Sequence, residues 1–114
     1  MNKLLVRRGV LARRRWLRVP ETGSAITVIS GLRPQTRVAV HGMIRSAGTV
    51  LVGSGPAYHF TLVDGSGELD VLFLGRPDVA GLRPSARIIA EGRLGSYNGK
   101  LALWNPRYAI EPAA

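Results

Sequence analysis

Hydrophobic and polar side chains alternate along the chain from residue 37 onward, with the period of two that is typical of β-strands. The first such segment has Val38, Val40 and Ile44 on one side and Arg37, His41 and Arg45 on the other. Gly42 lies in its middle and predicts a bulge or a sharp bend, which the first strand of a small barrel requires. The pattern therefore predicts a bent strand over residues 37–45.

Two further alternating segments flank a turn rich in glycine and predict a β-hairpin. Residues 58–63 and 68–74 are its arms, and Asp64-Gly-Ser-Gly67 is the turn, because glycine tolerates the positive φ that tight turns require. The side expected to face the core carries Tyr58, Phe60, Leu62, Leu69, Val71 and Phe73. The opposite side carries His59, Thr61, Val63, Asp70, Leu72 and Leu74.

The rest of the chain predicts short strands separated by loops. Residues 47–56 are rich in glycine and predict a loop or an irregular hairpin arm, and residues 75–84 predict a loop with room for one helical turn. The remaining expected elements are strands over 87–94 and 100–104, a tight turn at Asn98-Gly99, and a last extended piece over 107–110. Five strands at short spacing predict an all-β fold, a five-stranded antiparallel barrel.

The composition excludes several classes of protein and favours a polyanionic partner. The 114 residues include sixteen Lys and Arg, fourteen of them Arg, against seven Asp and Glu, for a formal net charge of +9. The absence of cysteine excludes a disulfide framework, a cysteine-based zinc site and a cysteine nucleophile. No apolar run approaches the ~18 residues of a transmembrane span, and no secretory segment is apparent, so we expect a cytoplasmic protein. The excess of arginine favours nucleic acid as the partner, ahead of anionic lipid.

The positive charge is concentrated at the amino terminus. Residues 1–21 hold seven basic side chains and one acid, for +6, and residues 22–114 hold nine basic and six acidic side chains, for +3. We therefore predict a basic arm over 1–21 and a barrel over 22–114, with Arg13, Arg14 and Arg15 as candidate phosphate contacts. A helical wheel gives the arm only a modest apolar side, and Gly9 costs ~1 kcal/mol relative to Ala. The arm is either a helix that forms on docking or a solvated tail.

Four segments of the sequence together resemble a known family. They are Val38-x-Val-x-Gly42, Phe60-Thr-Leu-Val-Asp-Gly-Ser-Gly67, Gly92-Arg93 and Asn105-Pro-Arg-Tyr108. Their order resembles that of small actinobacterial OB-fold nucleic-acid-binding proteins and is similar to the OB-fold in the wedge domain of the RecG helicase, over residues 25–111. The resemblance implies an OB-fold with a binding face across its second and third strands. That face would carry His59, Thr61 and Leu72, with Arg37 and Arg45 alongside.

A second group of candidate binding residues gathers around the closing hairpin. It consists of Arg93, Tyr97, Lys100, Trp104 and Arg107. Trp104 is out of phase with the strand's apolar positions, so an exposed ring among basic side chains would suit stacking on a nucleic-acid base. The alternative is that Trp104 and Tyr108 close one end of the barrel from inside.

The sequence contains no recognisable catalytic pattern. Serine, histidine and aspartate all occur, but nothing orders them as a triad, and no paired carboxylates are apparent. The turn around Asp64, Glu68 and Asp70 is explained by hairpin geometry without a cation. We therefore expect no enzymatic activity, no cofactor and no metal.

The expected function is that of a binding module. We expect nucleic-acid binding mainly through phosphate contacts, with single-stranded or branched DNA favoured over RNA. The alternative is a protein-interaction module that uses the barrel face and the arm, an option favoured by the apolar residues Val63, Leu72 and Leu74 on that face. The exposed strand edges of a small barrel also leave a homo-oligomer open.

Overall fold

The computed structural model describes residues 26–112, and the arm over 1–21, with Arg13, Arg14 and Arg15, lies outside these residues. The described chain is almost entirely β-structure, with one short 3-10 turn, η2 (Ile29–Gly31). The strands are β1 (Arg37–Val52), β2 (Gly55–Val63), β3 (Glu68–Leu74), β4 (Arg87–Tyr97), β5 (Lys100–Trp104) and β6 (Arg107–Ile110). The all-β prediction is therefore confirmed.

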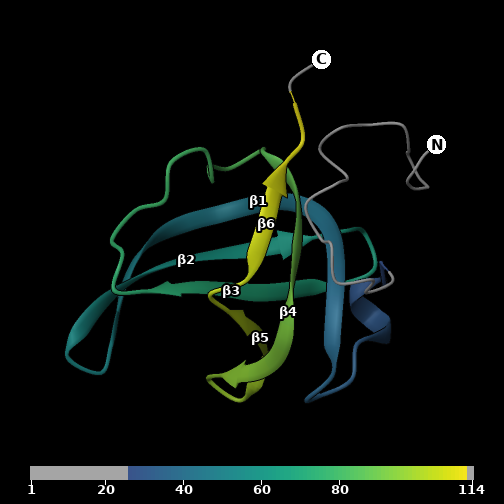
Figure 1. Ribbon diagram of the computed structural model, residues 1–114, viewed down its shortest axis with the longest axis horizontal. Coiled ribbons are helices and arrows are strands. Elements are labelled where there is room, and N and C mark those ends of the chain that lie inside the picture. Colours follow the sequence, from purple (N-terminus) through teal and green to yellow (C-terminus); the bar gives the residue numbers. More distant parts are fainter. Residues whose placement is uncertain (1–25, 113–114) are drawn as a thin grey trace.

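The strands form one sheet that closes on itself. Their order is β1-β2-β3-β5-β4-β6, and a further pairing of β1 with β4 completes a ring (Figure 1). Two features differ from the prediction of five antiparallel strands. The last extended piece is a sixth strand paired with β4, and β3 pairs with β5 in parallel. No helix within residues 26–112 has the length and apolar character needed to cross a membrane.

β1 closes the ring because its two halves pair with different strands. Its first half pairs with β4 and its second with β2, with a shift of register between Ile44 and Ser46. The bulge therefore lies at Arg45 and not at Gly42, so the bulge predicted there was wrong, while the other possibility, a bend, agrees with the change of partner strand at Met43. Gly42 serves a different purpose, since a Cβ there would lie 2.6 Å from the Val63 carbonyl oxygen. Only glycine lets the backbones of β1 and β2 approach so closely.

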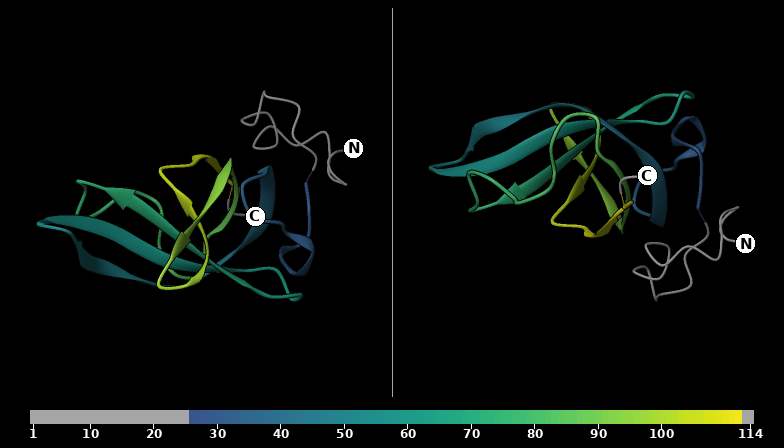
Figure 2. Two further views of the ribbon diagram at one scale, coloured as in Figure 1. Left: turned by 90° about the horizontal axis from the view of Figure 1, so that it is seen from below. Right: turned by 90° about the horizontal axis from the view of Figure 1, so that it is seen from above.

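β1 and β2 continue past the ring as a long hairpin. Strand pairing extends to Val52 and Gly55, so the loop predicted over residues 47–56 is largely strand, and the hairpin alternative was the right one. β2 runs along the molecule, and its two turns lie at opposite ends in both views of Figure 2. The hairpin thus leaves strand surface exposed beyond the core.

The inner side of the ring holds the core and confirms the predicted inward side of the central hairpin. Its large buried side chains include Phe60, Leu62 and Val71, each 0% exposed. The connector between β3 and β4 contains no helical turn, and it covers one end of the core with Val79 and Leu82.

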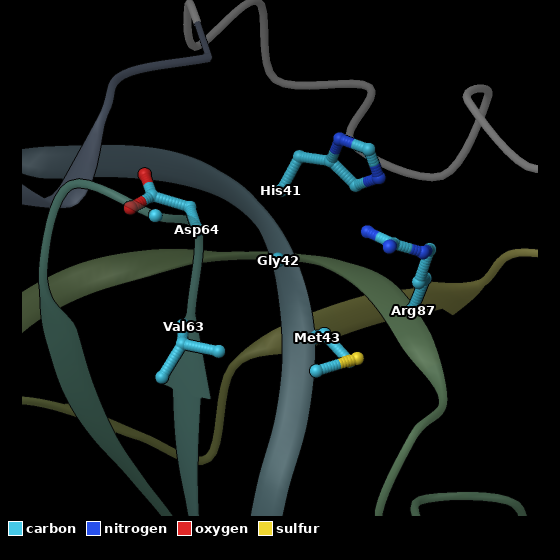
Figure 3. Close-up of a pocket in the computed structure, with 7 residues that line it drawn as sticks. His41, Gly42, Met43, Val63, Asp64 and Arg87 are labelled. Atoms are coloured by element: carbon cyan, nitrogen blue, oxygen red, sulfur yellow. The ribbon is translucent and has the colours of Figure 1, made fainter.

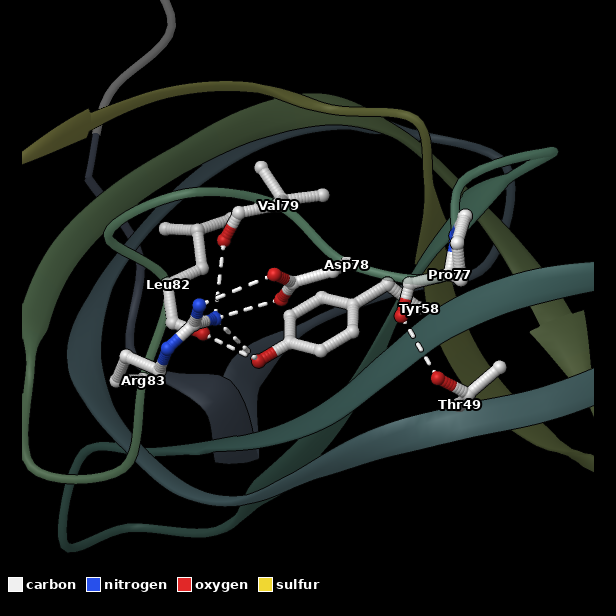
Figure 4. Close-up of polar contacts among 7 residues, drawn as sticks. All are labelled: Thr49, Tyr58, Pro77, Asp78, Val79, Leu82 and Arg83. Carbon is white, nitrogen blue, oxygen red and sulfur yellow. Dashed lines mark hydrogen bonds and ion pairs between the residues drawn. The ribbon is translucent and has the colours of Figure 1, made fainter.

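Hydrogen bonds hold this connector in place (Figure 4). The Tyr58 hydroxyl donates to the Leu82 carbonyl, and Arg83 donates to both carboxylate oxygens of Asp78 at 2.7 and 3.1 Å. The same guanidinium donates to the Tyr58 hydroxyl at 3.3 Å. We call Tyr58, Asp78, Leu82 and Arg83 the connector clamp.

Candidate functional site

Three ring side chains lie together on the outer side of the closed sheet. Strand pairing places His59 of β2 opposite Leu72 of β3, and Leu72 beside Trp104 of β5. Tyr97 ends β4 and contacts both rings, with centroid distances of 5.6 Å to His59 and 5.8 Å to Trp104. All three rings are half-buried, so part of each is open to solvent. We call His59, Tyr97 and Trp104 the ring face.

Local structure explains the outward position of Trp104. Its indole Nε1–H donates to the Ser96 carbonyl at 3.0 Å, which fixes the ring across β4. Gly95 makes room for it, because a Cβ there would lie 3.2 Å from Trp104 Cδ1. Tyr108, by contrast, packs edge-on against the core ring of Phe73 at 5.7 Å. Of the two alternatives for Trp104, the structure supports the outer position, while Tyr108 packs on the core.

Leu72 corrects one site prediction. Alternation placed it on the open surface, but it is 0% exposed. Its cross-strand neighbours on this side are the rings of His59 and Trp104, which shield it from water. Leu72 is therefore the apolar floor of the ring face and has no surface for a ligand.

A carboxylate lies beside the rings, between an imidazole and an amine. Asp70 Oδ1 is 2.9 Å from His59 Nε2, and Asp70 Oδ2 is 4.0 Å from Lys100 Nζ. The His59 and Asp70 side chains are 22% and 13% exposed. Thr61, another predicted site residue, lies opposite Asp70 on β2 and is half-buried. The pairing of Asp70 with His59 connects the carboxylate to the ring face.

Three predicted arginines gather where β4 leaves β1. Arg37 pairs across the strands with Arg93, and Arg107 of β6 lies opposite Glu91. Glu91 is 0% exposed and lies 3.4 Å from Arg37 Nη1. Alternation puts Arg93 on the same side of β4 as Tyr97, so these basic groups continue the ring face along the strand.

Arg45 is engaged by an acid. Its Nη1 donates to Glu68 Oε2 at 2.6 Å, and this hydrogen bond raises the pKa of Arg45 and lowers that of Glu68. Both side chains are about half exposed. Arg45 therefore contributes less free positive charge to a ligand than Arg93 or Arg107, which form no ion pair within residues 26–112.

A shallow hollow of about 310 Å³ opens on another part of the ring. Figure 3 shows His41 and Arg87 on one side of Gly42 and Asp64 on the other. Asp64 accepts the Ile29 amide at 2.8 Å and the Ser66 hydroxyl at 2.7 Å. Burial raises the pKa of Asp64, but these hydrogen bonds outweigh that effect and the net pKa is lowered. Asp64 therefore connects η2 to the turn between β2 and β3 through hydrogen bonds, which is a structural role.

Sequence reasoning missed the glycines that shape the site. Gly48 lies opposite His59, and a Cβ there would meet no atom within 4 Å. Gly95 gives Trp104 its place. Neither glycine has a sequence signal that distinguishes it from a turn glycine, because its role depends on which strand lies beside it. Within residues 26–112, no group of three acidic or histidine side chains is arranged to hold a metal ion.

Comparison with known proteins identifies a shared fold. No protein-family model matches the chain. No curated protein has significant similarity to it. Among solved structures, it resembles the solution NMR structure of the replication factor A related protein from Methanobacterium thermoautotrophicum, with a TM-score of 0.52 and 18% sequence identity. The match covers 75% of this chain and 90% of that one.

Proposed function

We propose that this chain is a noncatalytic OB-fold module that binds single-stranded nucleic acid, with DNA favoured over RNA. The observation that carries the proposal is the ring face: three contiguous, partly exposed rings on the outer side of a closed β-ring. The likeness to a replication factor A related protein supports the same class of function.

The ring face suits unpaired bases. Stacking of a base on an aromatic side chain contributes about 1–3 kcal/mol and tolerates any sequence, because every base has a flat π-surface. In a duplex these surfaces are stacked on one another and closed to the protein. Tyr97 contacts the other two rings, inclined at 41° to His59 and edge-on at 79° to Trp104, so the three form one contiguous aromatic surface whose rings face different directions. The geometry therefore favours a single strand, including the unpaired strand of a branched DNA.

Basic side chains border the platform and would contact phosphates. Lys100 is 73% exposed next to Tyr97, and Arg93 and Arg107 lie along and beside β4. Residues 1–21 add a charge of +6 to the attraction for a polyanion. Each neutralised phosphate releases counterions, so the affinity should fall steeply with salt.

The decisive experiment is fluorescence anisotropy of labelled single- and double-stranded oligonucleotides at several salt concentrations. We expect tighter binding to the single strand and a salt slope that corresponds to several phosphate contacts. Equal binding to both forms that disappears near physiological salt would leave only unspecific attraction to a basic protein and would refute the role of the ring face.

A matched pair of glycine variants tests the platform directly. Gly48→Ile places a side chain in the open space beside His59, whereas Gly55→Ile places the same side chain near the hairpin turn, in equally open space. We expect the first change to weaken single-strand binding about tenfold, the loss of one stacked base. The second should leave binding unchanged. Equal affinities for the two variants would exclude His59 from the interface.

A matched pair of arginine variants tests the phosphate contacts. Arg93→Gln with Arg107→Gln removes two charges beside the ring face, and Arg33→Gln with Arg76→Gln removes two exposed charges elsewhere. The first pair should lower the magnitude of the salt slope by about 1.4, because each lost phosphate contact on a single strand changes it by about 0.7. A similar change in the second pair would show that only net charge matters.

One observation favours a second function, protein interaction. Leu51, near the end of β1, and Leu74, at the end of β3, are 76% and 45% exposed on opposite faces of the sheet. A protein partner would cover them by apolar contact. If the chain binds no oligonucleotide even at low salt, and a stoichiometric protein partner co-purifies with it, this alternative replaces the first.

A further inference from the structure

Asp70 is an unexpected residue for a surface that binds a polyanion. It lies beside the ring face and carries a negative charge, which repels phosphates. The other acid on this side of β3, Glu68, lies at the strand end and is engaged by Arg45 at 2.6 Å. The ion pair with Arg45 accounts for the presence of Glu68 on this surface, whereas the presence of Asp70 beside the ring face still has to be explained.

The contacts of Asp70 leave part of its carboxylate available. Oδ1 pairs with His59 Nε2 at 2.9 Å, whereas Oδ2 is 4.0 Å from Lys100 Nζ, beyond hydrogen-bond distance. A carboxylate oxygen has two lone pairs, so Oδ2 can still accept a hydrogen bond. The nearby basic groups reduce the repulsion that Asp70 exerts on phosphates.

Small residues flank Asp70 in the sheet. Strand pairing places Thr61 and Ala102 on either side of Asp70, and Gly95 beside Ala102. This row lies between the row of His59 and Trp104 and the row of Tyr97, so the Tyr97 ring reaches across it. The Asp70 side chain keeps 13% exposure in this row, so the edge of a base stacked on a neighbouring ring would meet the carboxylate.

We propose that Asp70 is a specificity-determining residue that selects bases with N–H donors on their Watson–Crick edge, guanine first and thymine or uracil last. The inference rests on the proposed function. A carboxylate only accepts hydrogen bonds. Guanine offers two adjacent donors, N1–H and the N2 amino group, and cytosine and adenine offer one amino group each. Thymine and uracil present one donor between two carbonyl oxygens, which the carboxylate repels.

The test compares strands that differ in a single kind of base. The probes are oligo-dT and oligo-dT in which every second base is guanine, cytosine, adenine or inosine, measured by anisotropy with the full chain. We expect the guanine strand to bind about fivefold tighter than oligo-dT, because N1–H and the N2 amino group can donate to the two lone pairs of Oδ2, a contact weaker than a two-oxygen bidentate pair. Inosine lacks the N2 amino group and should lose most of this advantage, a result that needs no protein variant.

Two variants identify the carboxylate as the cause. Asp70→Asn keeps an oxygen for His59 but presents a donor as well, so the order of the bases should flatten while affinity for oligo-dT rises. Asp78→Asn removes the same charge on the distant connector and should keep the order. An Asp70→Asn protein with the wild-type order, or equal binding of guanine and inosine strands, would overturn the inference and leave the proposed function standing. If no strand binds at all, the proposed function fails as well.

Discussion

The connector clamp and the ring face use the same kinds of residue for different ends. The clamp contains a tyrosine, an aspartate and an arginine, and the ring face contains a tyrosine and a histidine with Asp70 and Lys100 beside them. In the clamp, the Tyr58 ring is 5% exposed and its hydroxyl is bonded to Leu82 and Arg83. In the ring face, Tyr97 is half-buried, and its hydroxyl has no hydrogen bond within the described residues. The tyrosine hydroxyl of the clamp is therefore already hydrogen-bonded within the protein, whereas that of the ring face can still bond to a ligand.

This difference separates a structural group from a candidate binding group. A buried tyrosine with a satisfied hydroxyl stabilises the fold that positions it, because breaking its hydrogen bonds leaves buried polar atoms unpaired. A partly exposed ring on a firm support retains free surface for a ligand at little entropic cost. The anchoring of Trp104 by the Ser96 carbonyl provides such a support beneath the ring face.

The largest expected effect comes from removing two rings. Tyr97→Ala with Trp104→Ala should weaken single-strand binding by roughly 2–6 kcal/mol, since each stacked base contributes about 1–3 kcal/mol. Anisotropy at fixed salt measures the loss, and circular dichroism checks that the β-fold is retained. If the single variant Tyr97→Ala already binds like the parent protein while remaining folded, the platform proposed for the ring face is wrong.

A change to a tyrosine of the clamp should instead lower the stability of the protein and leave its affinity for a single strand unchanged. Tyr58→Phe removes only the hydroxyl, and leaves the buried Leu82 carbonyl without its donor. We expect a loss of about 1–3 kcal/mol in the free energy of unfolding, measured by urea denaturation. Affinity for a single strand should stay unchanged at temperatures where the variant is folded. A binding loss in the folded variant would show that the clamp also shapes the interface.

Much of the fold could be predicted from alternation alone. The inward and outward sides of the central hairpin follow from its period of two, and Asp64-Gly is a strong turn signal. The sequence leaves the second half of β1 open between a loop and a hairpin arm, because Gly48, Gly53 and Gly55 obscure its alternation, although Thr49, Val50 and Val52 favour a strand that pairs with β2. The parallel pairing of β3 with β5 depends on ring closure, which local sequence does not encode.

The sequence indicated most of the residues of the candidate site, but not how their side chains are arranged relative to one another. The phase of Trp104 correctly indicated an outer position. Its approach to Tyr97, and the contact of Tyr97 with His59, depend on the twist of β4 and β5. Alternation placed Asp70 on the same side of the hairpin as His59, but the pairing of the two side chains at 2.9 Å was not predicted. Leu72 was misplaced because the rings that shield it come from other strands.

The smallest expected effect is a pH-dependent change in the stability of the connector clamp. In the clamp, the hydrogen bond from Arg83 lowers the pKa of Asp78 below its ordinary value. A group whose pKa is lower in the folded state binds its proton more weakly there, so its stabilising contribution is present above the ordinary carboxyl pKa and is lost as the pH falls through the folded value. Asp78→Asn should therefore be slightly less stable than the parent near neutral pH, and the difference should vanish in acid. Urea denaturation at a series of pH values from about 2 to 7, which spans the ordinary carboxyl pKa of ~4, measures this difference in the free energy of unfolding. A stability difference that stays constant with pH would mean that the Asp78 side chain stabilises the clamp by its shape alone. The contrast between the clamp and the ring face would then not depend on the charge of Asp78.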